Sequence, residues 1–161
     1  MRRAWALFLL LLLLPALCLN ALAEETELLE NGGFEILDDT GRPEGWYTNA
    51  YHAQEGYSRL TVTTEEARSG QYSVLVENAT ANDARFICTV NVKPNTMYRL
   101  SGYVLVSSME DVGNGANFAI EDIYSVSECL YDTGGEWQRI EWYGLTLSLI
   151  HISEPTRLGM I

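Results

Sequence analysis

Apolar and polar residues alternate with a period of two over most of the chain between Glu24 and Thr146. Because successive side chains of a strand point to opposite faces of a sheet, this alternation predicts half-buried β-strands. The alternating segments are also rich in β-branched and aromatic residues, which favour strands. The predicted strands are residues 59–64, 72–78, 84–92, 97–106, 115–120 and 136–144.

Short stretches rich in glycine, asparagine, aspartate and proline separate these strands, such as RSGQ at 68–71 and DTGGE at 132–136. These residue types favour turns. Strands at about ten-residue spacing with turns between them are typical of antiparallel sheets. We therefore predict an all-β fold, a single antiparallel β-sandwich of the jelly-roll type. Trp46, beside a turn, is favoured as a core residue, and the alternation places nine others mostly between the sheets: Phe34, Val62, Val74, Val76, Val90, Tyr98, Leu100, Val104 and Phe118.

The first residues have the composition of a secretory signal peptide. Arg2 and Arg3 precede an apolar run at 4–14, and Ala-Leu-Ala at 21–23 forms a cleavage site with small residues at its two ends. The apolar run is shorter than the roughly 20 residues that span a bilayer. We therefore expect residues 1–23 to be removed and the rest to be exported, either secreted or to the cell envelope.

The charge balance restricts the ligands that the chain can bind. The whole chain has 10 lysines and arginines against 22 aspartates and glutamates, and residues 24–146 have 7 against 21. Such an acidic surface repels nucleic-acid phosphates and anionic lipid headgroups. We therefore expect no nucleic-acid binding and no membrane-surface binding by this domain, whereas neutral ligands and cations suit it.

Two cysteines, Cys88 and Cys129, lie beyond the leader. In an exported protein they can form a disulfide bond. Two cysteines in a chain with a sizeable core can equally be small buried hydrophobic residues. The sequence leaves both alternatives open and favours the second.

Four segments resemble, in this order, carbohydrate-binding modules of the family 4, 9 and 22 type. They are NGGFEILDDTGRPEGW at 31–46, ARSGQYSVLVEN at 67–78, VKPNTMYRLSGYV at 92–104 and GEWQRIEW at 135–142. The resemblance implies a jelly-roll β-sandwich, like that of galactose-binding domains. It also implies that a polysaccharide or oligosaccharide lies in a cleft across one sheet, and that a structural calcium ion is often present.

A sugar ring presents C–H groups on its faces and hydroxyls at its rim. A binding face therefore needs aromatic rings beside amide, carboxylate or guanidinium groups. This chain has such residues outside the predicted core, on strand faces and after a turn. Those that we assign to carbohydrate binding are Tyr47, Tyr51, Arg85, Tyr103, Asn117 and Glu121. For Tyr103 taken alone, a solvated outer face is the alternative interpretation.

The resemblance also implies where calcium would bind. In the family a glutamate after a phenylalanine lies near the ion, with backbone oxygens of a turn and an aspartate of the last strand. These positions correspond here to Glu35 and to the turn with Arg68 and Ser69, but the aspartate is missing. Calcium takes about six or more oxygen ligands. We therefore expect a calcium site that is incomplete in this chain, and we interpret DDTG at 38–41 as a turn.

The last residues, 147–161, differ from the rest of the chain. They show no strand alternation, and LSLIHISEPTR at 147–157 resembles the translation of a transposase adapter used to build sequencing libraries. We therefore interpret residues 147–161 as a non-native tail, and expect the C-terminal strands of the domain to be missing. A divergent last strand is the alternative.

The sequence thus predicts a signal peptide at 1–23, a truncated carbohydrate-binding β-sandwich at 24–146 and a non-native tail at 147–161. The predicted function is non-catalytic glycan binding within a larger exported protein, joined to missing C-terminal domains. One alternative is a structural or adhesion sandwich that binds no sugar. A glycoside hydrolase is the weaker alternative, because the acidic residues fall mostly in turns and at strand ends. We therefore predict that the chain is not an enzyme.

Overall fold

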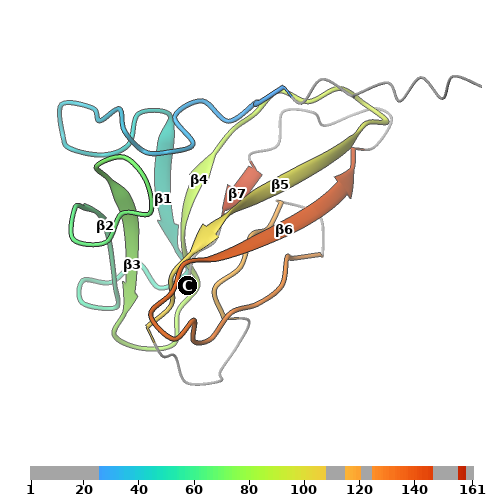
Figure 1. Cartoon of the computed structure of the whole chain (residues 1–161). Coiled ribbons are helices and arrows are strands. Elements are labelled where there is room, and N and C mark those ends of the chain that lie inside the picture. The colour runs from blue at the N-terminus through green and yellow to red at the C-terminus, as the bar shows by residue number, and fades with distance from the viewer. Residues whose placement is uncertain (1–25, 108–114, 121–124, 147–155, 159–161) are drawn as a thin grey trace, which may run out of the picture.

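The computed structural model describes residues 26–107, 115–120, 125–146 and 156–158 (Figure 1). Every regular element in these ranges is a β-strand, and all the strand pairs are antiparallel. The predicted all-β antiparallel fold is therefore confirmed. No helix in these ranges is long and apolar enough to cross a membrane. The predicted signal peptide and Glu121 lie outside them.

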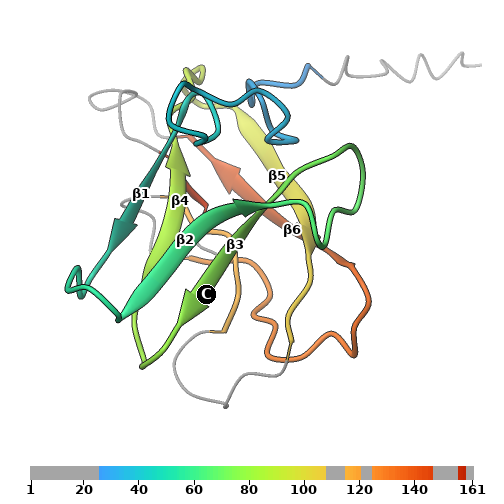
Figure 2. The same cartoon turned by 90° about the vertical axis from the view of Figure 1, so that its left-hand side faces the viewer.

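The strands form one sheet and two ribbons. Their bounds are β1 Trp46–Ala50, β2 Ser58–Thr63, β3 Ser73–Asn78, β4 Ala84–Cys88, β5 Met97–Val104, β6 Gln138–Leu145 and β7 Thr156–Leu158. The sheet has the order β1-β4-β7, whereas β2 pairs with β3 and β5 pairs with β6. Figure 2 shows the β2–β3 ribbon in front, with β1 and β4 on one side of it and β5 and β6 on the other. These small antiparallel sheets are consistent with a β-sandwich, and the jelly-roll order stays a prediction.

Most of the predicted strands are present, with three differences. Strand β4 ends at Cys88, so the predicted strand at 84–92 is shorter than expected. The predicted strand at 115–120 forms only isolated bridges, which pair Ala116 with Leu130 and Ala119 with Val126. Strand β1 was not predicted, because two adjacent aromatic residues at its start obscure the alternation. Strand β7 lies within the predicted tail and pairs with β4.

The core lies between the sheet and the two ribbons. Of the nine predicted core residues, Val74, Leu100, Val104 and Phe118 are buried, and the other five are half-buried. None is exposed, so the predicted inward faces of β2, β3 and β5 are confirmed. Trp46 is a core residue as predicted, at 7% exposed. The full buried cluster is Trp46, Val74, Phe86, Cys88, Leu100, Val104, Val106, Ala116, Phe118, Leu130, Ile140 and Trp142.

The carboxylate of Glu35 fixes the loop between β2 and β3. It accepts hydrogen bonds from the backbone N–H of Gln71 at 3.0 and 3.1 Å and from that of Tyr72 at 3.1 Å. Gly70 lies beside it with a φ of +70°, and a Cβ there would lie 2.3 Å from Glu35 Oε1. Position 70 therefore requires glycine for two reasons, the backbone conformation and the space that the carboxylate occupies.

Gly70→Ala is expected to destabilise the chain more than Gly41→Ala. Gly41 has a similar φ of +78°, but a Cβ there would contact nothing within 4 Å. The Gly41 variant should lose about 1 kcal/mol of unfolding free energy from backbone conformation alone. The Gly70 variant should lose at least about 1 kcal/mol more, because its methyl group overlaps the carboxylate. Chemical denaturation of both variants measures the difference, and equal losses would contradict the role of Glu35.

The two cysteines beyond the leader are both free. Cys88 is buried in the core at 4% exposed, and burial raises the pKa of its thiol to about 11. Cys129 is half-buried, and burial followed by the charge of Glu128 raises the pKa of its thiol. The interpretation of Cys88 as a small buried hydrophobic residue is therefore confirmed.

Cys88 is expected to resist alkylation in the folded protein. At pH 8 its thiol stays protonated, and the thiolate is the form that reacts. Iodoacetamide at this pH should modify Cys129 faster than Cys88, whereas both should react fully in denaturant. Peptide mapping by mass spectrometry gives the two rates. Equal rates in the native protein would show that Cys88 is not held in the core.

Candidate functional site

The outer face of the β1–β4 pair carries polar and aromatic side chains side by side. In this pair Trp46 lies opposite Cys88 and Asn49 lies opposite Arg85. Paired residues of an antiparallel sheet share a face, and the next pair along lies on the other. Because Trp46 and Cys88 point into the core, Tyr47, Asn49 and Arg85 point outward.

The same face continues past the end of β1 to Tyr51. The backbone N–H of Tyr51 donates to Asp83 O at 2.8 Å, which extends the pairing by one step. Tyr47 is 45% exposed and Tyr51 is 81% exposed. These two tyrosines are four residue steps apart along the extended chain, a distance of about 13 Å. The face therefore has an exposed aromatic ring at each end and the Asn49–Arg85 pair between them.

Arg85 is held in place by Asp83. Its Nε donates to Asp83 Oδ1 at 2.9 Å, and a second guanidinium nitrogen forms an ion pair with Oδ2. The side chain of Arg85 is only 15% exposed, whereas that of Asp83 is 47% exposed. A guanidinium with two fixed carboxylate contacts loses little further conformational entropy when a ligand arrives. Ile87, the cross-strand partner of Tyr47, is only 2% exposed, so a ligand on this face cannot contact it.

The loop after Tyr51 is fixed by one asparagine. Asn82 accepts a hydrogen bond from the backbone N–H of His52 and donates to its carbonyl oxygen, both at 2.9 Å. It also donates to Ser58 Oγ at 2.7 Å. The ring centroids of Tyr51 and His52 lie 4.8 Å apart, and those of His52 and Tyr57 lie 5.5 Å apart. This end of the face is therefore a row of three rings in edge-to-face and tilted contact, on an anchored loop.

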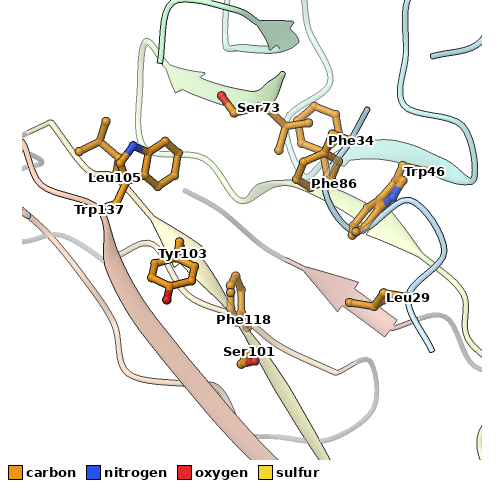
Figure 3. Close-up of a pocket in the computed structure, with 13 residues that line it drawn as sticks. Leu29, Phe34, Trp46, Ser73, Phe86, Ser101, Tyr103, Leu105, Phe118 and Trp137 are labelled. Atoms are coloured by element: carbon orange, nitrogen blue, oxygen red, sulfur yellow. The ribbon is translucent and has the colours of Figure 1, made fainter. Parts of the chain in front are cut away.

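Tyr103 does not lie on this face. It belongs to β5, and the guanidinium of Arg68 from the β2–β3 loop lies 3.4 Å from its ring centroid. Beside it is a cavity of about 140 Å³ between β5 and the start of β3 (Figure 3). Tyr103 lines this cavity together with core side chains such as Phe86 and Phe118, but neither Arg85 nor Asn117 lines it. The six predicted residues therefore do not form one groove.

Asn117 differs from its predicted outward position. It is 5% exposed, and its Nδ2 donates to the carbonyl oxygen of Gly115 at 3.0 Å. Alternation predicted that Asn117 points away from the core while its neighbours Ala116 and Phe118 point into it. In the structure, residues 115–118 are all buried. The alternation fails here because the segment is not a regular strand and both of its sides are covered. Glu121, predicted together with Asn117, lies outside the described residues.

The surroundings of Glu35 do not form a complete metal site. The loop that contains Arg68 and Ser69 turns the N–H groups of Gln71 and Tyr72 toward the carboxylate. N–H groups are donors and cannot ligate a cation. In the described ranges, no group of three or more histidine, cysteine, aspartate and glutamate side chains could hold a metal ion. These residues do not fit calcium by themselves. The DDTG segment is a turn, as predicted, in which Gly41 N–H donates to Asp38 O at 2.9 Å.

Two residues of this face were not predicted. Asn49 alternates with Tyr47 and Tyr51, so extending the period of two from the predicted tyrosines would have found it. Asp83 lies two residues before Arg85, and its role as the partner of that guanidinium had no signal in the sequence.

A family model described as a carbohydrate binding domain matches residues 26–141. The match includes β1 to β5 and the first half of β6, and therefore the whole of the face described above. No curated protein and no solved structure matches the chain. The family predicted from the four sequence segments is confirmed, and the chain belongs to the CBM_4_9 family of carbohydrate binding domains.

Proposed function

We propose that this chain is a non-catalytic glycan-binding module of a larger exported protein, joined to further C-terminal domains. Its binding face is the outer face of β1 and β4. The observation that carries the proposal is the placement of two exposed tyrosines around the Asn49–Arg85 pair, in a member of a carbohydrate binding domain family. The partner is a neutral polysaccharide or oligosaccharide.

The face has the two kinds of group that a sugar requires. The rings of Tyr47 and Tyr51 offer flat apolar surfaces for the C–H faces of a pyranose. The amide of Asn49 can both donate to and accept from hydroxyl groups, and Arg85 donates only. With a net charge of −12, the chain repels anionic ligands at long range, which supports a neutral glycan as the partner.

The groups on this face favour binding over hydrolysis. Cleavage of a glycosidic bond generally needs two carboxyl groups about 5 to 9.5 Å apart on either side of the bond. The cross-strand pairs of this face bring one carboxylate to it, that of Asp83, and that carboxylate forms an ion pair with Arg85. We therefore propose that this chain binds the glycan without cleaving it. Release of reducing sugar by the purified chain would contradict this.

We also propose that this chain binds calcium weakly or not at all at Glu35. The support is the hydrogen bonding of this carboxylate to two N–H groups, and the absence of a cluster of metal-binding side chains among the described residues. The midpoint of a thermal melt should then be the same with excess calcium and with chelator, because a ligand that does not bind the native state does not stabilise it. A calcium-dependent rise in the midpoint would contradict the proposal.

Tyr47→Ala is expected to weaken glycan binding about tenfold. It removes one aromatic surface from the face, a loss of about 1.4 kcal/mol. Tyr143→Ala is the matched control, because Tyr143 is 58% exposed on β6 and lies on another sheet. Isothermal titration against soluble β-glucans, xylans and mannans, with folding checked by circular dichroism, measures both.

Two outcomes of this titration would overturn the proposal. If the parent chain binds no glycan, the alternative of a structural or adhesion sandwich gains support. If Tyr143→Ala weakens binding as much as Tyr47→Ala, the glycan does not bind at the β1–β4 face.

A further inference from the structure

A cavity of about 230 Å³ lies at the free edge of β1, beside the proposed binding face. Strand β1 is at the edge of its sheet, with β4 on one side only. Because the N–H of Tyr51 points to β4, the alternation of the backbone turns the N–H and C=O of Thr48 and Ala50 toward the free edge. Residues 48–50 line the cavity, which therefore lies along the edge to which these backbone groups point.

The side chains around the cavity are polar but carry no carboxylate, ammonium or guanidinium group. The polar residues Thr48, Asn49, His52, Gln54 and Ser58 line it, together with the apolar residues Ala50, Ala53 and Leu60. This set offers donors and acceptors in similar numbers beside an apolar surface. It suits a neutral ligand with several hydroxyl groups, and it offers no counter-charge to an ion.

Hydrogen bonds tie the walls of the cavity together. Asn82 joins the loop at His52 to Ser58 on β2, and Ser58 Oγ in turn donates to Asn78 Oδ1 at 2.5 Å. The backbone N–H of Ala79 donates to the carbonyl oxygen of Tyr57 at 2.9 Å. A site that is already ordered loses less entropy on binding than a flexible loop does.

We propose that this cavity is a second subsite, which takes one neutral sugar ring at a chain end or branch of the glycan on the β1–β4 face. The inference rests on the proposed function. Asn49 connects the two sites, since it belongs to the outer face and also lines the cavity. The cavity is below the roughly 300 to 1,000 Å³ of pockets for larger ligands, so it holds one ring and not a chain.

Gln54→Ala tests the subsite, with Gln138→Ala as the matched control on β6. Ala53→Leu is a second test, because Ala53 is exposed at the cavity and a larger side chain fills the space without disturbing the core. For the tightest-binding glycan of the titration, Gln54→Ala should raise the Kd about 3- to 10-fold through loss of a hydrogen-bonding group. Ala53→Leu should raise it similarly, and Gln138→Ala should leave it unchanged.

The choice of ligands in the titration shows whether the sugar ring in the subsite is a chain end or a branch of the glycan. A linear tetrasaccharide and a tetrasaccharide with one single-sugar branch, both of the preferred backbone, are compared with the parent and Gln54→Ala. Loss with both ligands assigns the subsite to the chain end, and loss with the branched ligand alone assigns it to the branch. Either result supports the subsite.

Two outcomes would overturn it, and they are distinguishable. If Gln54→Ala and Ala53→Leu bind like the parent while Tyr47→Ala loses affinity, the subsite is wrong and the proposed function stands. If the parent binds no glycan in the panel, the proposed function and the subsite fail together.

Discussion

The register between β1 and β4 determines both the core and the candidate binding face. Trp46 is fixed inward, where its ring lies 4.8 Å from that of Phe34 and its Nε1 donates to Asn31 O at 3.2 Å. Because side chains alternate along a strand, the inward position of Trp46 requires Tyr47 to point outward. A slip of one residue would expose the tryptophan and bury the tyrosine. The packing of Trp46 in the core therefore also determines which side chains form the face.

Two polar side chains extend this order into the loops. Glu35 bonds to backbone N–H groups of the β2–β3 loop, and Asn82 bonds to both sides of the loop after β1. Each replaces bonds that the loop backbone would otherwise make with water. The two loops are therefore held by a few identified contacts, although they contain no regular structure. This order keeps Tyr51 and His52 beside the sheet.

The sequence predicted the strands well where one face is buried and the other is not. Strands β2, β3, β5 and β6 have that environment, and their alternation was correct within about two residues. It was wrong at residues 115–118, which are buried on all sides and so have no polar face to show. Alternation cannot reveal such a segment, because the pattern reports a difference between two faces.

The site was only partly predictable for a related reason. Alternation reports which face of its own strand a residue occupies, and it does not report which strands are neighbours. Tyr103 and Tyr47 were both predicted outside the core, but they lie on different sheets. The contact of Tyr103 with Arg68 comes from a loop far away in the sequence. Only the three-dimensional pairing separates Tyr103 from the face and adds Asp83 to it, whereas extending the alternation from Tyr47 would have added Asn49.

The groups on the face differ in what they can recognise. Every pyranose has C–H groups on its ring faces, so on the proposed face Tyr47 and Tyr51 would provide affinity without much selectivity among sugars. Selectivity requires hydrogen-bonding groups in fixed positions, because a hydroxyl in the wrong place leaves a polar group unpaired. Arg85 is such a group, since Asp83 fixes its orientation, and Asn49 lies opposite it in the register. If the proposed function is correct, discrimination among glycans would therefore depend on the Asn49–Arg85 pair, and the two tyrosines would add affinity with little selectivity.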